Sequence, residues 1–217
     1  MADSELLKKD LFGEISRADS GGELRIVRDA GPARPWVRWL ARRLLGREAR
    51  VLAAMTGIDG VPQLLRADPM RLERSYLAGV ALQVARPRDP AYFRAAARLL
   101  RCLHSIGVVH NDLAKEPNLL VCDDGSPGFV DFQLGWYAPG RGRLFRRLAY
   151  EDLRHLLKHK RTYCPQHLTQ RERAILSNPS FLARINRRTI KPLYLFVTRR
   201  LLGWSDREGA GDRGARF

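Results

Sequence analysis

The sequence lacks the features that would mark a secreted or membrane-spanning protein. No run of apolar residues approaches the roughly 18 that are needed to cross a bilayer. The first residues are polar and acidic, unlike those of a signal peptide. Three scattered cysteines, Cys102, Cys122 and Cys164, have no C-x-x-C spacing, which predicts neither a zinc site nor a disulfide framework. We therefore expect a cytoplasmic protein in a reducing compartment.

Negative charge is also scarce. Asp and Glu number 23 against 39 Lys and Arg, which gives a formal net charge of +16. Such a field attracts nucleic acid, anionic lipid or phosphorylated substrates. The sequence has no zinc-finger spacing, homeodomain-like arm or RNP-type aromatic motif, which argues against nucleic acid as a partner. A solvated, arginine-rich surface is the simpler explanation for most of the charge, and peripheral contact with an anionic membrane is the alternative.

The composition is nevertheless that of a folded protein. Hydrophobic residues make up 45% of the 217 residues, enough for a real core. A chain of this length has room for one compact domain, or for two small lobes that share a cleft.

The residues suited to chemistry gather in one part of the chain. His110, Asp112, Lys115 and Asn118 lie between short apolar runs, and Asp131 follows after a turn at 123–125. This pattern predicts two short antiparallel strands that bring Asn118 and Asp131 together, with Asp112 at the mouth of the preceding loop. An acid and an amide so placed can hold Mg²⁺, which prefers oxygen ligands. The remaining acid can then orient a hydroxyl nucleophile.

These motifs resemble the signature of the protein-kinase-like superfamily, H-R-D-x-x-x-x-N followed by D-F-G. The resemblance is closer to its small bacterial members related to RIO-type and lipopolysaccharide kinases. Asn118 follows Asp112 by six positions, one more than usual, and Gln133 stands where the final glycine is expected. The resemblance implies an α+β fold of two lobes: a reduced, β-rich N-lobe over 1–77 and a mainly helical C-lobe over 78–204. We expect the glycine-rich polar tail, 205–217, to be disordered.

In the first lobe, the expected cation over the phosphates is an arginine. Strands over 11–16 and 23–28 flank a strong turn signal at 19–22, and no G-x-G-x-x-G motif is present. By the resemblance, Arg28 takes the place of the ATP-pairing lysine, and Ile26, on the same strand face, lines the adenine pocket. Arg28 as an exposed strand end, or Lys8 or Lys9 as the cation instead, are the alternatives.

A helix is predicted between Pro35 and Gly57 because apolar residues recur at steps of three and four. Glu48 falls on its apolar side, where an unpaired carboxylate is costly, and the resemblance pairs it with Arg28. The opposite face carries Arg38, Arg42, Arg43 and Arg50. These arginines fit a solvated face, or a contact with a membrane or substrate.

Further elements follow in the order that a kinase would have. Strands are predicted over 63–65 and 70–73, and then a hinge over 74–79, where main-chain groups near Glu73 and Tyr76 are expected to bind adenine. Helices are predicted over 90–106 and 144–160. In the second of these, Asp152 is the candidate brace for the catalytic loop, with a surface ion pair as the alternative. A last helix near 192–204 would pack on the core or lie on an anionic membrane.

The resemblance assigns a role to each site residue. Asp112 would orient the hydroxyl and accept its proton, Lys115 would reach the γ-phosphate, and Asn118 and Asp131 would hold Mg²⁺. The predicted activity is ATP-dependent transfer of the γ-phosphate to a hydroxyl, with a serine or threonine of a protein as the first acceptor. A lipid-linked sugar of the lipopolysaccharide type is a second acceptor. A pseudokinase that binds a nucleotide or a partner is the alternative, because the nucleotide-clamping half is reduced.

Overall fold

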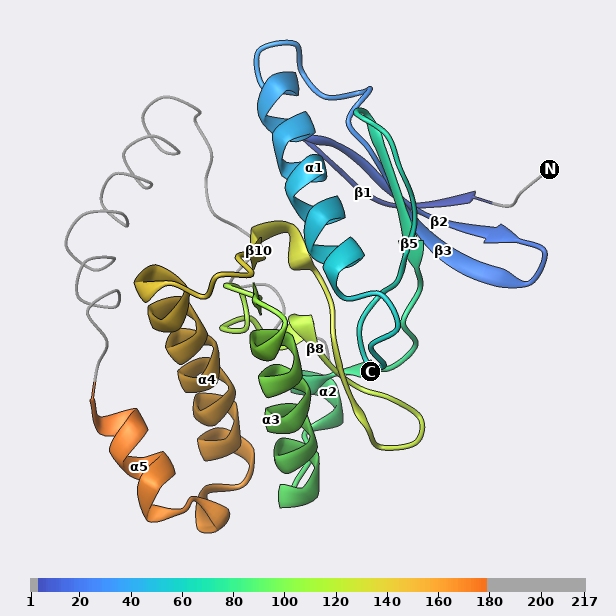
Figure 1. Cartoon of the computed structure of the whole chain (residues 1–217). Coiled ribbons are helices and arrows are strands. Elements are labelled where there is room, and N and C mark those ends of the chain that lie inside the picture. The colour runs from blue at the N-terminus through green and yellow to red at the C-terminus, as the bar shows by residue number, and fades with distance from the viewer. Residues whose placement is uncertain (1–3, 179–217) are drawn as a thin grey trace, which may run out of the picture. The chain divides into compact units, whose positions relative to one another are not determined.

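The first half of the chain forms an antiparallel sheet. The computed structural model describes residues 4–178, and the predicted last helix and the tail 205–217 lie outside them. The sheet has five strands in the order β1-β2-β3-β5-β4 (Figure 1). Their bounds are β1 Ser4–Asp10, β2 Gly13–Ser20, β3 Glu23–Asp29, β4 Leu64–Ala67 and β5 Arg71–Ser75. The predicted hairpin is confirmed as β2 and β3, whereas the first strand, β1, lies ahead of the predicted strands.

Glycines allow the tight turns of the two hairpins that join β1, β2 and β3. Gly21 and Gly22 both have positive φ, as a tight two-residue turn between β2 and β3 requires, and the Gly22 amide donates to Asp19 Oδ1 at 2.8 Å. At Gly13, φ is +128° and an added Cβ would overlap the Asp29 carbonyl. This closeness lets the β1–β2 turn lie directly against the end of β3.

Helix α1, Arg38–Ala54, packs along this sheet (Figure 1). It begins three residues after Pro35, because the chain first makes a turn in which the Val37 amide donates to the Arg34 carbonyl at 3.0 Å. Its buried residues are spaced at helical intervals: Ala41, Leu45, Glu48, Val51 and Leu52. The predicted helix is therefore confirmed, with Glu48 on its buried side.

The second half of the described chain is mainly helical. Its helices are α2 Leu82–Ala85, α3 Pro90–Ser105, α4 Arg143–Tyr163 and α5 Gln170–Ser177. Its short strands are β6 Val80–Ala81, β7 Val108–Val109, β8 Leu119–Val121, β9 Pro127–Phe129 and β10 Trp136–Tyr137. Three one-turn 3₁₀ helices cover Glu116–Asn118, Phe132–Leu134 and Pro165–His167. Strands β6, β8 and β9 form one small sheet, and β10 pairs with β7.

Helix α3 shows how the local sequence sets an element. Asp89 caps it by accepting from the Ala91 amide at 2.7 Å, and Pro90 occupies the first helical position. Its buried face carries Phe93, Ala96 and Leu100 at helical spacing. Helix α3 therefore delivers the chain into β7 and the loop that follows, as the sequence predicted.

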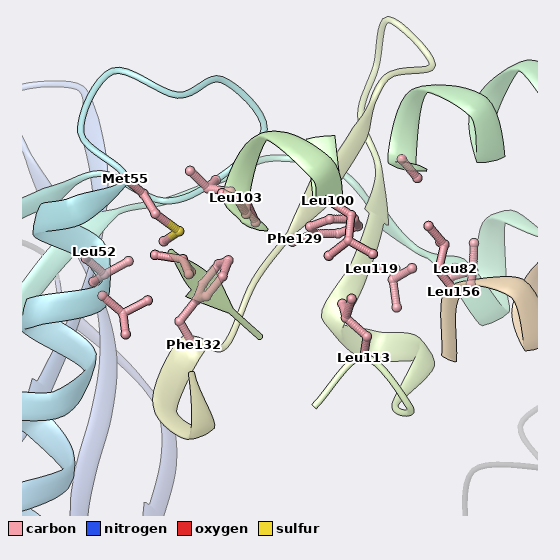
Figure 2. Packing of buried hydrophobic residues seen from close by; sticks show 14 of the residues in the cluster. Leu52, Met55, Leu82, Leu100, Leu103, Leu113, Leu119, Phe129, Phe132 and Leu156 are labelled. Carbon is pink, nitrogen blue, oxygen red and sulfur yellow. The ribbon is translucent and has the colours of Figure 1, made fainter. Parts of the chain in front are cut away.

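One hydrophobic core joins the sheet-rich and helical parts. Figure 2 shows Leu52 of α1 and Met55 just after it near Phe132 and Leu103, and the cluster continues through Phe129 and Leu119 to Leu156 of α4. Phe129 and Phe132 are the largest of the side chains that are almost wholly buried. Burying each such side chain stabilises the fold by about 1.5–3 kcal/mol.

The predicted α+β arrangement is confirmed: an antiparallel sheet with one helix comes first, and a helical part follows. Residues from both parts belong to one compact unit, Met1–Leu176, so the proposed lobe boundary at residue 77 stays a prediction. Among the helices of residues 4–178, none is both long and apolar enough to cross a bilayer.

Candidate active site

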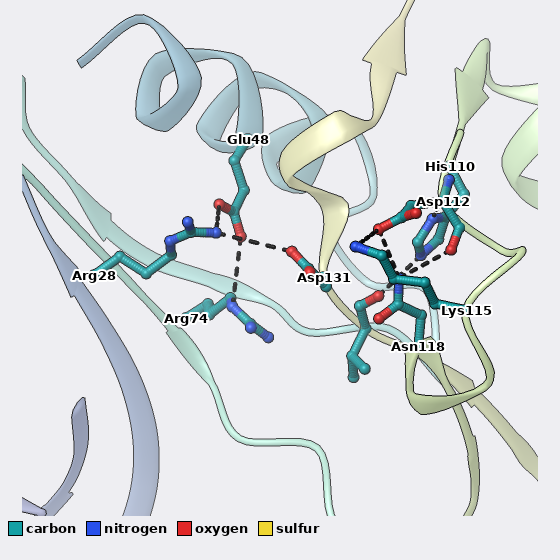
Figure 3. A network of polar contacts seen from close by, with 9 residues as sticks. Arg28, Glu48, Arg74, His110, Asp112, Lys115, Asn118 and Asp131 are labelled. Atoms are coloured by element: carbon teal, nitrogen blue, oxygen red, sulfur yellow. Dashed lines mark hydrogen bonds and ion pairs between the residues drawn. The ribbon is translucent and has the colours of Figure 1, made fainter. Parts of the chain in front are cut away.

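The loop between β7 and β8 holds Asp112 in a fixed position. Asn118 Nδ2 donates to the Asp112 main-chain oxygen at 2.9 Å and to Asp112 Oδ2 at 3.1 Å. Lys115 Nζ lies 2.9 Å from the same Oδ2 (Figure 3). Asp112 and Asn118 are buried, whereas Lys115 is exposed. Both donors contact the same carboxylate oxygen and so fix the orientation of the Asp112 side chain.

His110 holds this loop through both nitrogens of its ring. It is fully buried, and its ring lies 4.5 Å from the ring of Phe132 between centroids. The Asp112 amide donates to His110 Nδ1 at 3.3 Å, so the ring proton is assigned to Nε2, which then donates to the Val130 carbonyl at 2.9 Å. Both ring nitrogens are engaged, which gives His110 a structural role in this loop.

Asp152 of α4 braces the same loop, as the sequence predicted. Its Oδ2 accepts from the His110 amide at 2.7 Å, and its Oδ1 accepts from the Asn111 amide at 2.9 Å. Asn111 has a left-handed backbone with φ of 65°, a conformation that Asn tolerates better than most residues. The buried Asp152 carboxylate therefore satisfies two amides that the sharp turn of the loop leaves without strand partners.

Strand register brings Asp131 to the other side of Asn118. Leu119 pairs with Phe129 between β8 and β9, and the Val130 amide donates to the Asn118 carbonyl at 3.0 Å. Asp131 follows with φ of 62° and a side chain that is 40% exposed. The structure thus brings together Asp112, Asn118 and Asp131, the three residues that the motif spacing singled out.

The predicted pair of Arg28 and Glu48 is present. Arg28 Nη1 donates to Glu48 Oε2 at 2.8 Å, and the same Nη1 lies 3.9 Å from Asp131 Oδ1 (Figure 3). Ile26, two residues before Arg28 on β3, is buried. Arg28 therefore connects the Glu48 carboxylate of α1 to the acidic residue that follows β9.

A second arginine, Arg74, was not anticipated by the sequence reasoning. Its Nε lies 3.6 Å from Glu48 Oε1, and β3–β5 pairing places it opposite Ile26. Burial is the main cause that lowers the pKa of Arg74. Repulsion from Arg28 lowers the pKa further, whereas attraction to Glu48 raises it. The available signal was the alternation of β5, because Leu72 and Arg74 share the face that α1 covers.

Glu73 and Tyr76, at the predicted hinge, make contacts within the sheet. Glu73 points to the opposite face of β5, where Oε2 is 3.3 Å from Arg25 Nη1 and Oε1 is 3.2 Å from Arg71 Nε. The Tyr76 amide donates to the Leu24 carbonyl at 3.0 Å, and its ring is exposed. The Glu73 side chain is therefore turned away from Arg28 and Glu48, and adenine binding by main-chain groups of this segment stays a prediction.

The donor set fits a magnesium ion shared with phosphates. Because Asn118 Nδ2 donates to Asp112, the amide Oδ1 is the atom of this side chain that could bind a metal. Within residues 4–178, no group of three or more His, Cys, Asp or Glu is arranged to hold a metal. Mg²⁺ commonly takes only one or two protein oxygens in addition to substrate phosphates and water. Asn118 and Asp131 match that pattern.

Comparison with known families decides the assignment. The sequence model of the phosphotransferase enzyme family, APH, matches residues 11–139, which is more than half of the chain. The chain belongs to this family. The matched region of the phosphotransferase includes Arg28, Glu48, Asp112, Asn118 and Asp131.

The fold of the phosphotransferase is similar to that of a solved kinase. The crystal structure of the Rio2 kinase from Chaetomium thermophilum matches with a TM-score of 0.58 at 12% sequence identity. The match covers 81% of this chain and 61% of that chain. Together with the family match, this similarity confirms the predicted membership of the protein-kinase-like superfamily. No curated protein matches the sequence.

Arg47 is a further residue that the sequence reasoning missed. Its Nε donates to the Gly135 carbonyl at 2.6 Å and its Nη2 to the Leu134 carbonyl at 2.9 Å. Asn111 Nδ2 donates to the same Leu134 carbonyl at 3.0 Å. The segment after Asp131 is thus held by α1 on one side and by the catalytic loop on the other. No local sequence pattern indicates such contacts, because Arg47 donates to carbonyls that lie 87 and 88 residues away along the chain.

Proposed function

We propose that the protein transfers the γ-phosphate of ATP to a hydroxyl group with the help of Mg²⁺. The observation that carries this proposal is the position of Asp112. Its carboxylate is held by Asn118 and Lys115, and Asn118 is tied through the Val130 amide to the segment that bears Asp131. A proton acceptor beside an oxygen donor pair is the arrangement that phosphoryl transfer to a hydroxyl requires.

Each residue then has a defined part in the reaction. Asp112 orients the acceptor hydroxyl and takes its proton as the new oxygen–phosphorus bond forms and the bond to the leaving ADP breaks. Asn118 and Asp131 would hold the metal, which neutralises charge on the phosphates. Lys115 and Arg28 supply positive charge to the phosphates, and Arg28 is kept in place by Glu48.

The nucleotide base is proposed to lie at the strand β3 and hinge side. Ile26 is the apolar contact proposed for adenine, and main-chain groups around Glu73 and Tyr76 supply the hydrogen bonds. Because the Tyr76 amide already donates to Leu24, the carbonyls of this segment and the residues after it are the better candidates.

A serine or threonine hydroxyl of a protein is the first acceptor proposed. One observation favours the second, a sugar hydroxyl of the lipopolysaccharide type. After Asp131 the chain makes one 3₁₀ turn, pairs β10 with β7, and enters α4 at Arg143. This connection offers little main chain to which an extended peptide could bind.

The experiment incubates the purified chain with Mg²⁺ and γ-labelled ATP, and with casein or lipopolysaccharide as acceptor. Label should pass to one acceptor class, and Asp112→Asn should lower turnover by about 10²-fold or more with little change in KM for ATP. The two side chains have nearly the same shape, so circular dichroism should match. ATP binding without transfer or hydrolysis above that of the Asp112→Asn variant would identify a pseudokinase and overturn the proposal.

A further inference from the structure

A groove lies between α1, β10 and the beginning of α4, outside the site described above. It has a volume of about 1110 Å³, including the part that is open to solvent. Its lining residues are Leu40, Arg43, Leu44, Arg47, Arg50, Trp136, Tyr137, Leu144 and Leu148. We call this surface the arginine groove. It combines apolar and aromatic side chains with three guanidinium groups.

The arginine groove has an excess of positive charge. None of its lining residues is acidic, so its three arginines have no carboxylate within the lining to neutralise them. Burial lowers the pKa of Arg47, and repulsion from Arg50 lowers it further. An anion in this groove would relieve that repulsion, which identifies the charge of the occupant.

Exposed aromatic residues extend the groove along α1. Trp36 and Trp39 are 54% and 65% exposed. Trp39 lies one helical turn before Arg43 and so continues the stripe that lines the groove, and Trp36 lies in the turn just before α1. Leu144 and Tyr137 are also exposed. Exposed apolar side chains beside arginines are typical of a surface that lies at a membrane–water interface.

We propose that the arginine groove, with Trp36 and Trp39, docks the protein on the surface of an anionic membrane. The arginines bind lipid phosphates, and the tryptophans enter the headgroup layer, where amphipathic rings are favoured. Nucleic acid would also meet the arginines, but it would leave Leu40, Leu44 and Leu144 in contact with a polar backbone. The apolar half of the groove therefore favours lipid.

The first experiment measures sedimentation of the full chain with phosphatidylcholine vesicles, with and without phosphatidylglycerol. Binding should require phosphatidylglycerol and weaken with salt. The double variant Arg43→Glu/Arg50→Glu should lower affinity at least tenfold, since each basic residue near an anionic surface contributes to binding. Neither residue belongs to the proposed catalytic site.

The matched control reverses the same number of charges elsewhere. Arg94 and Arg98 are exposed on α3 and do not line the groove. Arg94→Glu/Arg98→Glu should keep affinity within about twofold of the parent, because the attraction falls off within a Debye length. Equal losses in both double variants would mean that net charge alone drives binding, and the proposal would be wrong.

A second readout uses the tryptophans directly. Trp36, Trp39 and Trp136 are three of the four tryptophans in the chain. Their fluorescence should shift to shorter wavelength with phosphatidylglycerol vesicles, and Trp36→Ala/Trp39→Ala should reduce both the shift and the affinity. Thermal melts check that each variant folds. Binding to polyuridylate but not to vesicles, lost in Arg43→Glu/Arg50→Glu, would replace the membrane with nucleic acid and overturn the proposal.

Discussion

At the scale of single residues, Glu48 has two positive partners for one buried carboxylate. Arg28 bonds to one oxygen, and Arg74 lies near the other at 3.6 Å without a hydrogen bond. An arginine side chain is longer than a lysine side chain and ends in a planar guanidinium. Arg28 can therefore bond to Glu48 and approach Asp131 with the same nitrogen. The replacement of lysine therefore preserves the connection between α1 and the site.

The first prediction concerns the stability that depends on Glu48. Glu48→Ala should lower the free energy of unfolding by about 3–5 kcal/mol, because Arg28 and Arg74 then lose their buried counterion and only the partly exposed Asp131 carboxylate remains near them. Urea unfolding monitored by circular dichroism measures the change. Glu5→Ala is the control, since Glu5 pairs with Arg17 on the exposed surface. An equal effect of both substitutions would contradict the role given to Glu48.

A second residue-scale prediction follows from His155 of α4. Burial, and then repulsion from Lys158, His159 and Arg154, lowers its pKa to about 4 against the attraction of Asp152. The unfolded chain therefore binds the His155 proton at a higher pH than the folded chain does. Stability from this residue is present above about pH 6.5 and is lost as the pH falls toward 4.

His155→Gln should flatten the loss of stability over this pH range. The change amounts to about 3 kcal/mol at most for the pKa difference involved. Urea unfolding of both chains between pH 7 and pH 4 measures it. If the parent and the variant lose stability in parallel, His155 is not the titrating group.

At the scale of elements, α4 supports the loop between β7 and β8 through Asp152, and also through His159, whose Nε2 lies 2.8 Å from the Leu113 carbonyl. Asp152 accepts from the amides of His110 and Asn111 and so holds the turn that directs Asp112. Asp152→Asn leaves only one side-chain oxygen for two buried amides. We expect the free energy of unfolding to fall by about 1–3 kcal/mol.

Activity separates this role from plain stability. In Asp152→Asn, kcat should fall at temperatures where circular dichroism shows the chain fully folded, because the loop that orients Asp112 is loosened. Glu151→Gln is the control on the same helix, since Glu151 pairs with Arg154 and not with the loop. Unchanged kcat in Asp152→Asn would show that the brace is not needed for catalysis.

The elements themselves were largely predictable, for reasons that are local. The hairpin turn at Gly21–Gly22, the helical spacing from Ala41 to Leu52, and the cap at Asp89 each lie within a short window of sequence. Arg74 and Arg47 could not be placed in this way. Their partners, Glu48 and the Leu134 and Gly135 carbonyls, are far along the chain and are reached only after the sheet and α1 have packed. Alternation along β5 places the Glu73 side chain on the face opposite Arg74, where it meets Arg25 and Arg71.

At the scale of the whole described molecule, the sheet-rich part and the helical part share one core. Leu52 of α1, Met55 just after it, Leu103 of α3 and Phe132 beside Asp131 are all buried in the same cluster. A shift of α1 therefore meets Phe132 directly, because close-packed cores transmit displacements instead of absorbing them. This continuity makes α1 the element through which an event at the surface can reach Asp131, a proposed metal ligand.

Arg47 connects the arginine groove to the segment that follows Asp131. It lines the arginine groove and also holds the carbonyls of Leu134 and Gly135, a few residues after Asp131. A lipid phosphate bound beside Arg50 would change the electric field at Arg47, and with it the hold on the segment that follows Asp131. The protein would then show interfacial activation, a rate that depends on the area of anionic surface offered to it. We expect phosphatidylglycerol vesicles to raise kcat for a soluble acceptor in the parent and not in Arg43→Glu/Arg50→Glu. An equal rate with and without vesicles would mean that the membrane only positions the enzyme.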